Sequence, residues 1–254
     1  MKGRVEQKGD YGNWVSKRLI YIPAVMTVIC LGLSLLAPVF LIGVVLFLVL
    51  LIYFAYVYYK FSPNGGDVQS RIRGLVMKHV DWDGEGRAIE IGCGNGALAI
   101  SVAKKYPESH VTGIDYWGTQ RDYAKELCTK NAEIEGVADR MGFQKVNAVA
   151  LPFPDGYFDL AVSNLVFHDV QDAKDKRDVI KEALRVVKKG GKFVFQDLFL
   201  EKRIYGEPDD LLNTIKGWGV ENVEFVHTSN SDFIPRALRL PFMLGSIGII
   251  YGTK

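Results

Sequence analysis

The first apolar pattern in the chain is a long stretch without charge near the N-terminus. From Leu19 to Tyr59 there is no Asp, Glu, Lys, Arg or His. A helix that crosses the hydrocarbon core of a bilayer needs about 20 residues, so this stretch has the length of two crossings. Ala37-Pro38 lies near its middle, and proline disfavours a helical conformation at the residue before it. We therefore predict two transmembrane helices, over about 19–36 and 39–59.

Two crossings return the chain to the side on which it started. Lys17-Arg18 precede the apolar stretch and Lys60 follows it. Basic flanks favour the cytoplasmic side, so the pattern predicts a hairpin in the cytoplasmic membrane with both termini in the cytoplasm. Because the first helix is short, a hairpin that dips into one leaflet is an alternative. The other alternative, a cleaved signal peptide, fits poorly because its apolar core would be far shorter.

After Phe61 the pattern changes to short apolar runs that alternate with helical periodicity. A glycine- and proline-containing linker (61–66) leads into a helix from Asp67 to Val80. Further helices are expected through residue 105 and over 119–135, 172–187 and 211–218. Strands are expected over 87–91, 111–114, 143–146, 158–163, 192–196, 220–226 and 247–251. This alternation predicts an α/β domain over 67–254 with a doubly wound, mostly parallel seven-stranded sheet, after a membrane anchor over 1–60.

Composition and charge give no indication of nucleic-acid binding, of disulfides or of a metal site. The chain has 31 Lys+Arg and 29 Asp+Glu, a net charge of +2 that is too weak to indicate nucleic-acid binding. The three cysteines have no spacing that indicates a disulfide or a zinc site. No His, Cys and Asp cluster has metal-ligand spacing, so we expect no metal. The oligomeric state cannot be read from these features.

A glycine-rich loop follows the strand predicted at 87–91 and opens a helix. Gly92, Gly94 and Gly96 are spaced G-x-G-x-G, unlike the G-x-G-x-x-G fingerprint of dinucleotide binding. Glu90 ends the strand before the loop, and Asp115 ends the next strand, where a carboxylate can accept hydrogen bonds from both ribose hydroxyls. Together these residues predict a site for a cationic ligand that carries a ribose and no pyrophosphate.

The same residues resemble the class I S-adenosylmethionine-dependent methyltransferases. The branch of the ubiquinone/menaquinone-biosynthesis C-methyltransferases is the most similar, and the resemblance covers about Asp67 to Lys254. It depends on four motifs in order: Glu90-x-Gly92-x-Gly94-x-Gly96, Val111-Thr-Gly-Ile-Asp115, the segment from Asn147 to Asp159, and Leu184-Arg-Val-Val-Lys-Lys-Gly-Gly-Lys192. The resemblance implies a Rossmann-like methyltransferase fold and S-adenosyl-L-methionine as the cofactor.

The resemblance also implies roles for individual residues. The methionine part of the cofactor would lie on Glu90 and on the loop residues Gly92, Cys93, Gly94 and Gly96. Asp115 would hold the ribose, and Tyr116 and Trp117 would cover the adenine. Where the family usually has Asp-Ala this chain has Asn147-Ala148, whose amide oxygen can still accept from the adenine amino group. Asn164 would lie near the methyl group and the methionine carboxylate.

Methyl transfer needs a base only when the acceptor must lose a proton. The candidate is His168, with Asp169 beside it; the alternative is a histidine that only forms structural hydrogen bonds in its loop. The segment from Thr228 to Gly245 mixes apolar residues with Arg236 and Arg239. It is either a lid packed on the core or an amphipathic segment that faces acidic headgroups or covers a lipid-like substrate.

The sequence therefore predicts a membrane-anchored methyltransferase whose partners are the lipid bilayer and a lipid-like or other apolar small molecule. Two alternatives remain. One is a methyltransferase that acts on a membrane protein, and the other is a non-catalytic membrane protein that binds the cofactor.

Overall fold

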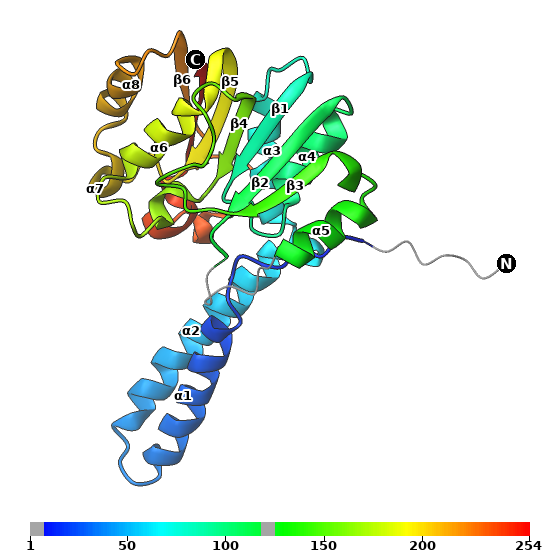
Figure 1. Cartoon of the computed structure of the whole chain (residues 1–254). Helices are drawn as coiled ribbons and strands as arrows, with labels where there is room; N and C mark the ends of the chain where they lie inside the picture. Colours follow the sequence, from blue (N-terminus) through cyan, green and yellow to red (C-terminus); the bar gives the residue numbers. More distant parts are fainter. Residues whose placement is uncertain (1–7, 118–124) are drawn as a thin grey trace, which may run out of the picture. The chain divides into compact units, whose positions relative to one another are not determined.

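A computed structural model describes residues 8–117 and 125–254 (Figure 1). The chain divides into two compact units, one of them Gly12–Ile72. The other unit is Arg73–Lys254 together with the described residues before Gly12. This division differs from the predicted one, since residues 61–72 group with the two helices and residues 8–11 group with the C-terminal unit.

The first unit is a pair of antiparallel helices joined by a short turn. Helix α1 is Arg18–Ser34 and helix α2 is Phe40–Phe61, close to the predicted ranges. The two helices pack closely at Gly43, where a Cβ would lie 2.8 Å from the sulfur of Cys30. Small residues allow this kind of close approach between helices.

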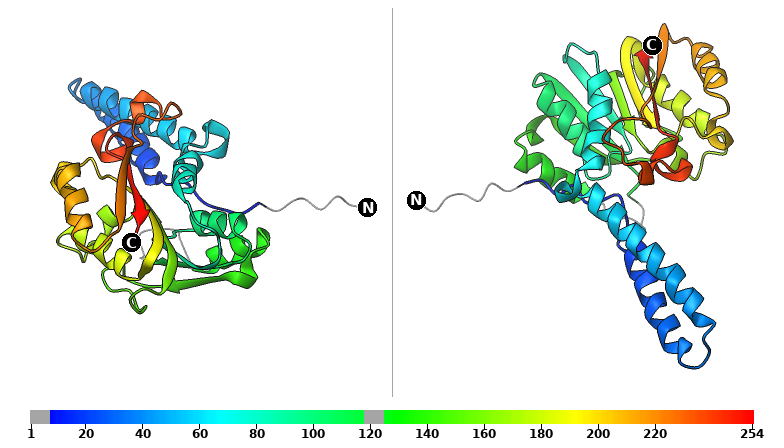
Figure 2. Two further views of the ribbon diagram at one scale, coloured as in Figure 1. Left: turned by 90° about the horizontal axis from the view of Figure 1, so that it is seen from above. Right: turned by 180° about the vertical axis from the view of Figure 1, so that it is seen from behind.

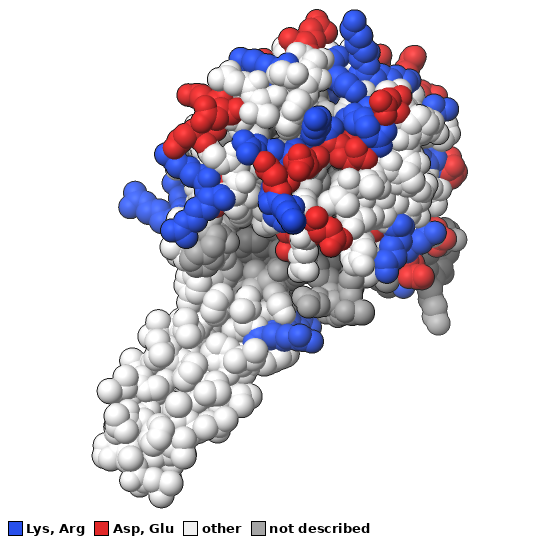
Figure 3. All heavy atoms as spheres, turned by 60° about the vertical axis from the view of Figure 1, so that its left-hand side comes forward, with Lys and Arg blue, Asp and Glu red and all other residues white. Residues whose placement is uncertain are grey.

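The surface of this helical pair is apolar. Most of the exposed large hydrophobic side chains that the structure describes lie between Leu19 and Tyr59. Figure 3 shows the two helices as an almost uninterrupted white surface, whereas charges of both signs cover the α/β unit. Helix α2 has 22 residues and is long and apolar enough to cross a membrane. Helix α1 is also apolar but has 17 residues, so among the described residues one of the two predicted spans has this length.

The residues that lead into α1 contact the far end of α2 and the start of helix α3 (Val68–His79). The side-chain amide of Asn13 donates to the carbonyl of Tyr58 at 3.0 Å, and the backbone N–H of Trp14 donates to Gln69 at 3.1 Å. The ring of Trp14 packs edge-on against Phe61. The basic flanks of the two helices, Lys17-Arg18 and Lys60, therefore lie at the same end of the pair.

The second unit contains one seven-stranded sheet with the strand order β3-β2-β1-β4-β5-β7-β6. The first five strands in this order are parallel, and β7 runs antiparallel to both of its neighbours. The seven-stranded, mostly parallel sheet predicted from the sequence is confirmed. The strands are β1 Gly86–Ile91, β2 Ser109–Asp115, β3 Met141–Lys145, β4 Phe158–Asn164, β5 Val187–Asp197, β6 Asn222–His227 and β7 Gly248–Thr253.

Helices cover both faces of the sheet (Figure 2). Helix α3 lies on one face with α4 (Ala97–Lys105) and α5 (Lys125–Ile134), above a core that includes Val76, Leu98 and Cys128. The opposite face carries α6 (Lys176–Arg185) and α8 (Pro208–Lys216), and its core includes Ile180 and Leu211. A short helix, α7 (Lys202–Tyr205), was not predicted.

Some helices and strands begin at other residues than predicted. Helix α6 begins at Lys176 and not at 172, because the Asp175 carboxylate accepts the backbone N–H of Arg177 and caps the helix there. Strand β5 begins at Val187, earlier than the predicted 192, and continues through Gly190-Gly191. Helix α5 was predicted from 119; residues 118–124 lie outside the described residues.

The segment from Thr228 to Gly245 contains a 3-10 turn, Arg236–Leu238, and a π-helical turn, Pro241–Gly245. Ile234, Leu238 and Leu244 are buried in it. The guanidinium of Arg239 donates to the carbonyls of Ile234 and Ser231 at 3.1 and 3.2 Å. Arg239 therefore stabilises the segment from within, as expected for the packed-lid alternative, whereas Arg236 is exposed.

Candidate active site

The predicted site residues gather at the carboxyl ends of β1, β2, β4 and β5. The glycine loop (residues 92–96) has positive φ angles at Gly92, Gly94 and Gly96, of 76°, 54° and 81°. Only glycine adopts this backbone readily. A Cβ at Gly92 would overlap the side chain of Val166, in the loop after β4. The glycine loop and the loop that carries His168 are thus in direct contact.

Glu90 joins the glycine loop to helix α4. Its side chain is buried, and one carboxylate oxygen accepts the backbone N–H of Ala99 at 2.6 Å. Burial raises the pKa of Glu90 to about 8, and the nearby negative charge of Asp115 adds to the effect; the Ala99 hydrogen bond and Arg73 oppose it. A cation bound nearby would lower the pKa of such a carboxyl group, because the cation favours the charged form.

Asp115 connects the end of β2 to the glycine loop. One of its oxygens accepts the backbone N–H of Gly94 and the other that of Trp117, both at 2.9 Å. A carboxylate has about four acceptor positions, so two remain for ribose hydroxyls. Asp115 therefore both shapes the loop and suits the predicted ribose contact.

The two aromatic residues after Asp115 have different surroundings. The indole N–H of Trp117 donates to the carbonyl of Gly94 at 2.9 Å, so this ring packs on the glycine loop. Tyr116 is 61% exposed, and the ammonium of Lys145 lies 5.3 Å from its ring centre. The predicted adenine contacts of both rings remain predictions.

Asn147 and Ala148 lie in the loop after β3 and are half-buried. The Asn147 side-chain oxygen accepts the backbone N–H of Val149 at 3.2 Å, and its amide N–H donates to Asp172 at 2.5 Å. These bonds fix which side of the carboxamide is the acceptor. An amide oxygen has two lone pairs, so the predicted hydrogen bond from adenine is compatible with this arrangement.

Two cysteines lie at the inner side of the glycine loop. The thiol of Cys128 donates to the carbonyl of Gly94 at 3.0 Å, and Cys93 lies beside it. Burial, followed by the neighbouring Cys128, raises the pKa of the Cys93 thiol. Both side chains are buried and pack in the core next to the glycine loop.

Asn164 and Gln196 face each other across β4 and β5, as register partners. Both are buried, and the side-chain oxygens of both have no hydrogen-bond partner among the described residues. The amide N–H of Gln196 donates to Thr228 at 3.0 Å, which fixes the direction of its oxygen. Buried oxygens without partners are costly, so this pair fits a ligand that supplies N–H or O–H donors.

His168 is held by a buried carboxylate. Its ring Nδ1 lies 2.6 Å from Asp197 Oδ1, and Asp197 itself is fully buried at the end of β5. The other Asp197 oxygen accepts the backbone N–H groups of Val166 and Phe167 at 3.0 and 2.7 Å. The hydroxyl of Tyr205 also lies near Asp197; burial, and then this charge, raise the Tyr205 pKa.

The sequence identified His168 but not its partner. Asp169 is exposed, and its backbone N–H closes a turn to the carbonyl of Val166; its catalytic role remains a prediction. The carboxylate that contacts the His168 ring is that of Asp197. Both residues follow predicted strands, His168 after 158–163 and Asp197 after 192–196, and this was the available signal for the pair.

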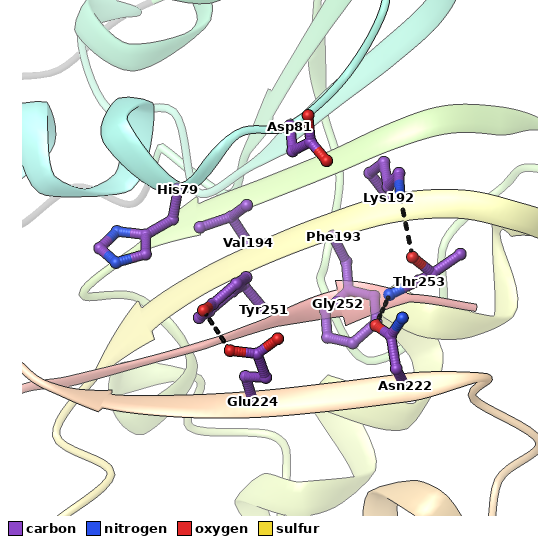
Figure 4. Close-up of a pocket in the computed structure, with 10 residues that line it drawn as sticks. All are labelled: His79, Asp81, Lys192, Phe193, Val194, Asn222, Glu224, Tyr251, Gly252 and Thr253. Carbon is purple, nitrogen blue, oxygen red and sulfur yellow. Dashed lines mark hydrogen bonds between the residues drawn. The ribbon is translucent and has the colours of Figure 1, made fainter.

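A separate pocket of about 130 Å³ lies away from these residues (Figure 4). It includes Asn222 and Thr253, the first residue of β6 and the last of β7, at the opposite edge of the sheet from Asp197. Its polar groups bond to one another: Lys192 donates to Thr253, and Tyr251 donates to Glu224. Among the described residues there is no group of three His, Cys, Asp or Glu side chains that could hold a metal ion.

Comparison with known proteins identifies the kind of domain that these strands form. Residues 89–195, from β1 to β5, match the family model described as a methyltransferase domain. These residues form an S-adenosylmethionine-dependent methyltransferase domain. Its cofactor is S-adenosylmethionine, and the contacts that the sequence assigns to individual residues remain predictions.

The relatives of this methyltransferase domain differ in their acceptors. An O-methyltransferase of Aspergillus nomiae is 32% identical over 117 residues, which are 45% of this chain and 48% of that protein. A ubiquinone/menaquinone biosynthesis C-methyltransferase of Geotalea daltonii is 28% identical over 123 residues, 48% of this chain and 49% of that protein. The chain thus spans about half the length of these two curated relatives.

A solved structure has the same fold. The geranyl diphosphate C-methyltransferase from Streptomyces coelicolor, in complex with Mg²⁺, geranyl diphosphate and S-adenosyl-L-homocysteine, superposes with a TM-score of 0.55. The match covers 74% of this chain and 79% of that chain, at 15% sequence identity. At this identity the likeness shows the fold of the methyltransferase domain and not its acceptor.

Proposed function

We propose that the protein is a methyltransferase anchored in the cytoplasmic membrane by the α1–α2 hairpin. It transfers the methyl group of S-adenosylmethionine to a lipid-like or other apolar small molecule. The observation that carries the proposal is the presence, in one chain, of a methyltransferase site and a helical hairpin with an apolar surface.

The anchor is supported by how the chain divides. Residues before the hairpin and residues after it belong to the same compact unit, since both backbone groups of Asp10 bond to Asn131. One folded unit cannot lie on both sides of a bilayer. Therefore α2 does not cross the membrane alone: α1 and α2 either both cross it or both remain in one leaflet.

The length of α1 determines whether the hairpin can span the bilayer. At 1.5 Å per residue its 17 residues extend about 26 Å, slightly less than the roughly 30 Å hydrocarbon core. The turn after it adds exposed apolar residues, Leu35, Leu36 and Val39. A hairpin of this length spans a slightly thinned bilayer at modest cost. The basic flanks at its open end favour the cytoplasmic side for the catalytic unit.

The chemistry follows from the His168–Asp197 pair. S-adenosylmethionine supplies a methyl group that is activated by a sulfonium charge. Because a carboxylate only accepts hydrogen bonds, the short contact places the proton of a neutral His168 on Nδ1. The lone pair on Nε2 can then take a proton from an acceptor, while Asp197 stabilises the resulting imidazolium. Asn164 and Gln196 can orient an acceptor group that carries a hydrogen.

The acceptor class follows from the anchor. Only six residues (62–67) separate the end of α2 from the start of α3, and extended chain spans at most about 3.6 Å per residue. The catalytic unit is thus tethered close to the membrane surface, where apolar molecules concentrate. The alternative acceptor, a membrane protein, would meet the same tethered site.

The test is transfer of labelled methyl from S-adenosylmethionine by the full-length protein, in vesicles that contain extract of the source membrane. We expect label in the solvent-extractable lipid fraction, and its loss by at least a hundredfold in His168→Ala. Asp197→Asn should retain part of the turnover. Label in the protein fraction alone would favour the membrane-protein acceptor. Binding of the cofactor without any transfer would favour the non-catalytic alternative.

A further inference from the structure

A buried asparagine connects the extreme N-terminal part of the described chain to the glycine loop. Asn131, on α5, is fully buried. Its side-chain oxygen accepts the backbone N–H of Asp10 at 2.8 Å, and its amide nitrogen donates to the carbonyl of Asp10, also at 2.8 Å. The same nitrogen donates to the backbone carbonyl of Asn95 at 3.0 Å. One carboxamide therefore binds both backbone groups of Asp10 and one backbone group of the glycine loop.

The next residue gives this segment a second attachment. The hydroxyl of Tyr11 donates to Glu135 at 3.2 Å, and Glu135 also pairs with Lys104 at the end of α4. Burial, and then the charge of Glu135, raise the pKa of Tyr11, so its hydroxyl remains a donor. Residues 8–11, called here the N-terminal strap, are thus tied to the ends of both helices next to the glycine loop.

The loop residue that the strap fixes has an unused polar atom. The side chain of Asn95 is 6% exposed, and its oxygen has no hydrogen-bond partner among the described residues. Because Asn131 holds the Asn95 backbone, it also limits where this oxygen can lie. Without the strap, the Asn131 side chain would lose two of its three hydrogen bonds. Its buried carboxamide would then have unsatisfied polar groups, which costs free energy.

We propose that the strap and Asn131 hold the glycine loop in its cofactor-binding shape, so that cofactor affinity depends on residues that precede the membrane hairpin. Asn131 is then a positioning residue that acts on the loop through Asn95. The inference relies on the domain's use of S-adenosylmethionine and not on the nature of the methyl acceptor. It also means that removal of residues 1–60 would remove the strap together with the anchor.

The test compares two substitutions at the same position in the full-length protein. Asp10→Pro removes the backbone N–H that Asn131 accepts, and Asp10→Ala keeps it and serves as the reference. The preceding residue is Gly9, which tolerates the restriction that proline imposes. Binding of S-adenosylhomocysteine is measured by calorimetry in detergent. We expect Asp10→Pro to bind at least tenfold more weakly than Asp10→Ala.

A second variant and a second readout separate positioning from simple stability. Tyr11→Phe removes only the hydroxyl bond to Glu135 and should weaken binding about two- to threefold. Hydrogen exchange in Asp10→Pro should be faster in residues 92–97 and unchanged in β4 and β5. Equal affinities of Asp10→Pro and Asp10→Ala, even with a lower melting temperature for one of them, would overturn the inference. If the wild-type protein binds no S-adenosylhomocysteine, it is the proposed function that fails.

Discussion

Val166 lies directly against Gly92, so that the loop after β4 packs on the glycine loop with no room for a side chain between them. Gly92 also has a φ of 76°, which residues with a Cβ rarely adopt. We expect Gly92→Ala to push the two loops apart and to reduce binding of S-adenosylhomocysteine at least a hundredfold. Calorimetry of the full chain measures this. Gly142→Ala, where a Cβ would meet nothing within 4 Å, is the matched control.

Asp115 is expected to determine much of the cofactor affinity. Asp115→Ala removes the acceptor for ribose hydroxyls as well as the acceptor for the backbone N–H groups of Gly94 and Trp117. Hydrogen bonds to charged groups contribute about 1.5–3 kcal/mol, so affinity should fall at least tenfold. Asp115→Asn keeps one acceptor oxygen and should lose less. An unchanged affinity of Asp115→Ala would contradict the ribose assignment.

Glu90 should make the stability of the protein depend on pH. Its pKa is about 8 in the folded state, compared with 4.5 ordinarily. Between these values the unfolded chain loses a proton that the folded chain retains, so the contribution of Glu90 is fully present below about pH 4.5 and is lost as the pH rises to about 8. Glu90→Gln should therefore become relatively more stable at pH 8 than at pH 5. Thermal melting of both proteins without cofactor tests this; parallel curves would contradict it.

The topology of the hairpin can be tested from outside the cell. Because described residues on either side of α1–α2 belong to one unit, the chain before and after the hairpin should lie on the same side of the membrane. The basic flanks favour the cytoplasm, so positions 2 and 254 should both be cytoplasmic. A single cysteine at either position should resist a membrane-impermeant maleimide in intact cells and react after lysis. A cysteine at position 36, in the turn, should react from outside if the hairpin spans. Protection at position 36 would indicate a hairpin confined to one leaflet.

Deletion of the apolar helices alone should separate anchoring from cofactor binding. Replacing residues 19–59 with a short glycine-serine linker keeps the N-terminal strap and the catalytic unit. Affinity for S-adenosylhomocysteine should stay within about twofold of wild type, whereas methylation of a membrane-dissolved acceptor should fall by more than tenfold. If the deleted protein methylates its acceptor as fast as the full chain does in vesicles, the acceptor is not taken from the membrane.

The sheet and the site residues on it were predictable because local patterns specify them. Gly92, Gly94, Gly96 and Asp115 lie at strand ends, and parallel strands bring their carboxyl ends to one edge. The bond between His168 and Asp197 was not predicted, because it joins residues on different strands whose side-chain directions depend on the turn after β4.

The hydrogen bonds of Asp10 and Tyr11 to the α/β unit could not be predicted from the sequence either. Both precede the apolar stretch and were read as part of the anchor, since the only local signal there is a polar flank. Their bonds to Asn131 and Glu135 connect residues more than a hundred positions apart. No periodicity or motif reports a contact of this kind.

The distance along the chain between Asp10 and Asn131 has a consequence for synthesis. The two residues are 121 positions apart, and a ribosome adds roughly 5–20 residues per second. Asn131 is thus synthesised several seconds after the strap, and during that time both apolar helices leave the ribosome. If the hairpin is a membrane anchor as proposed, its insertion should precede closure of the catalytic unit, which would then complete its fold already attached to the bilayer.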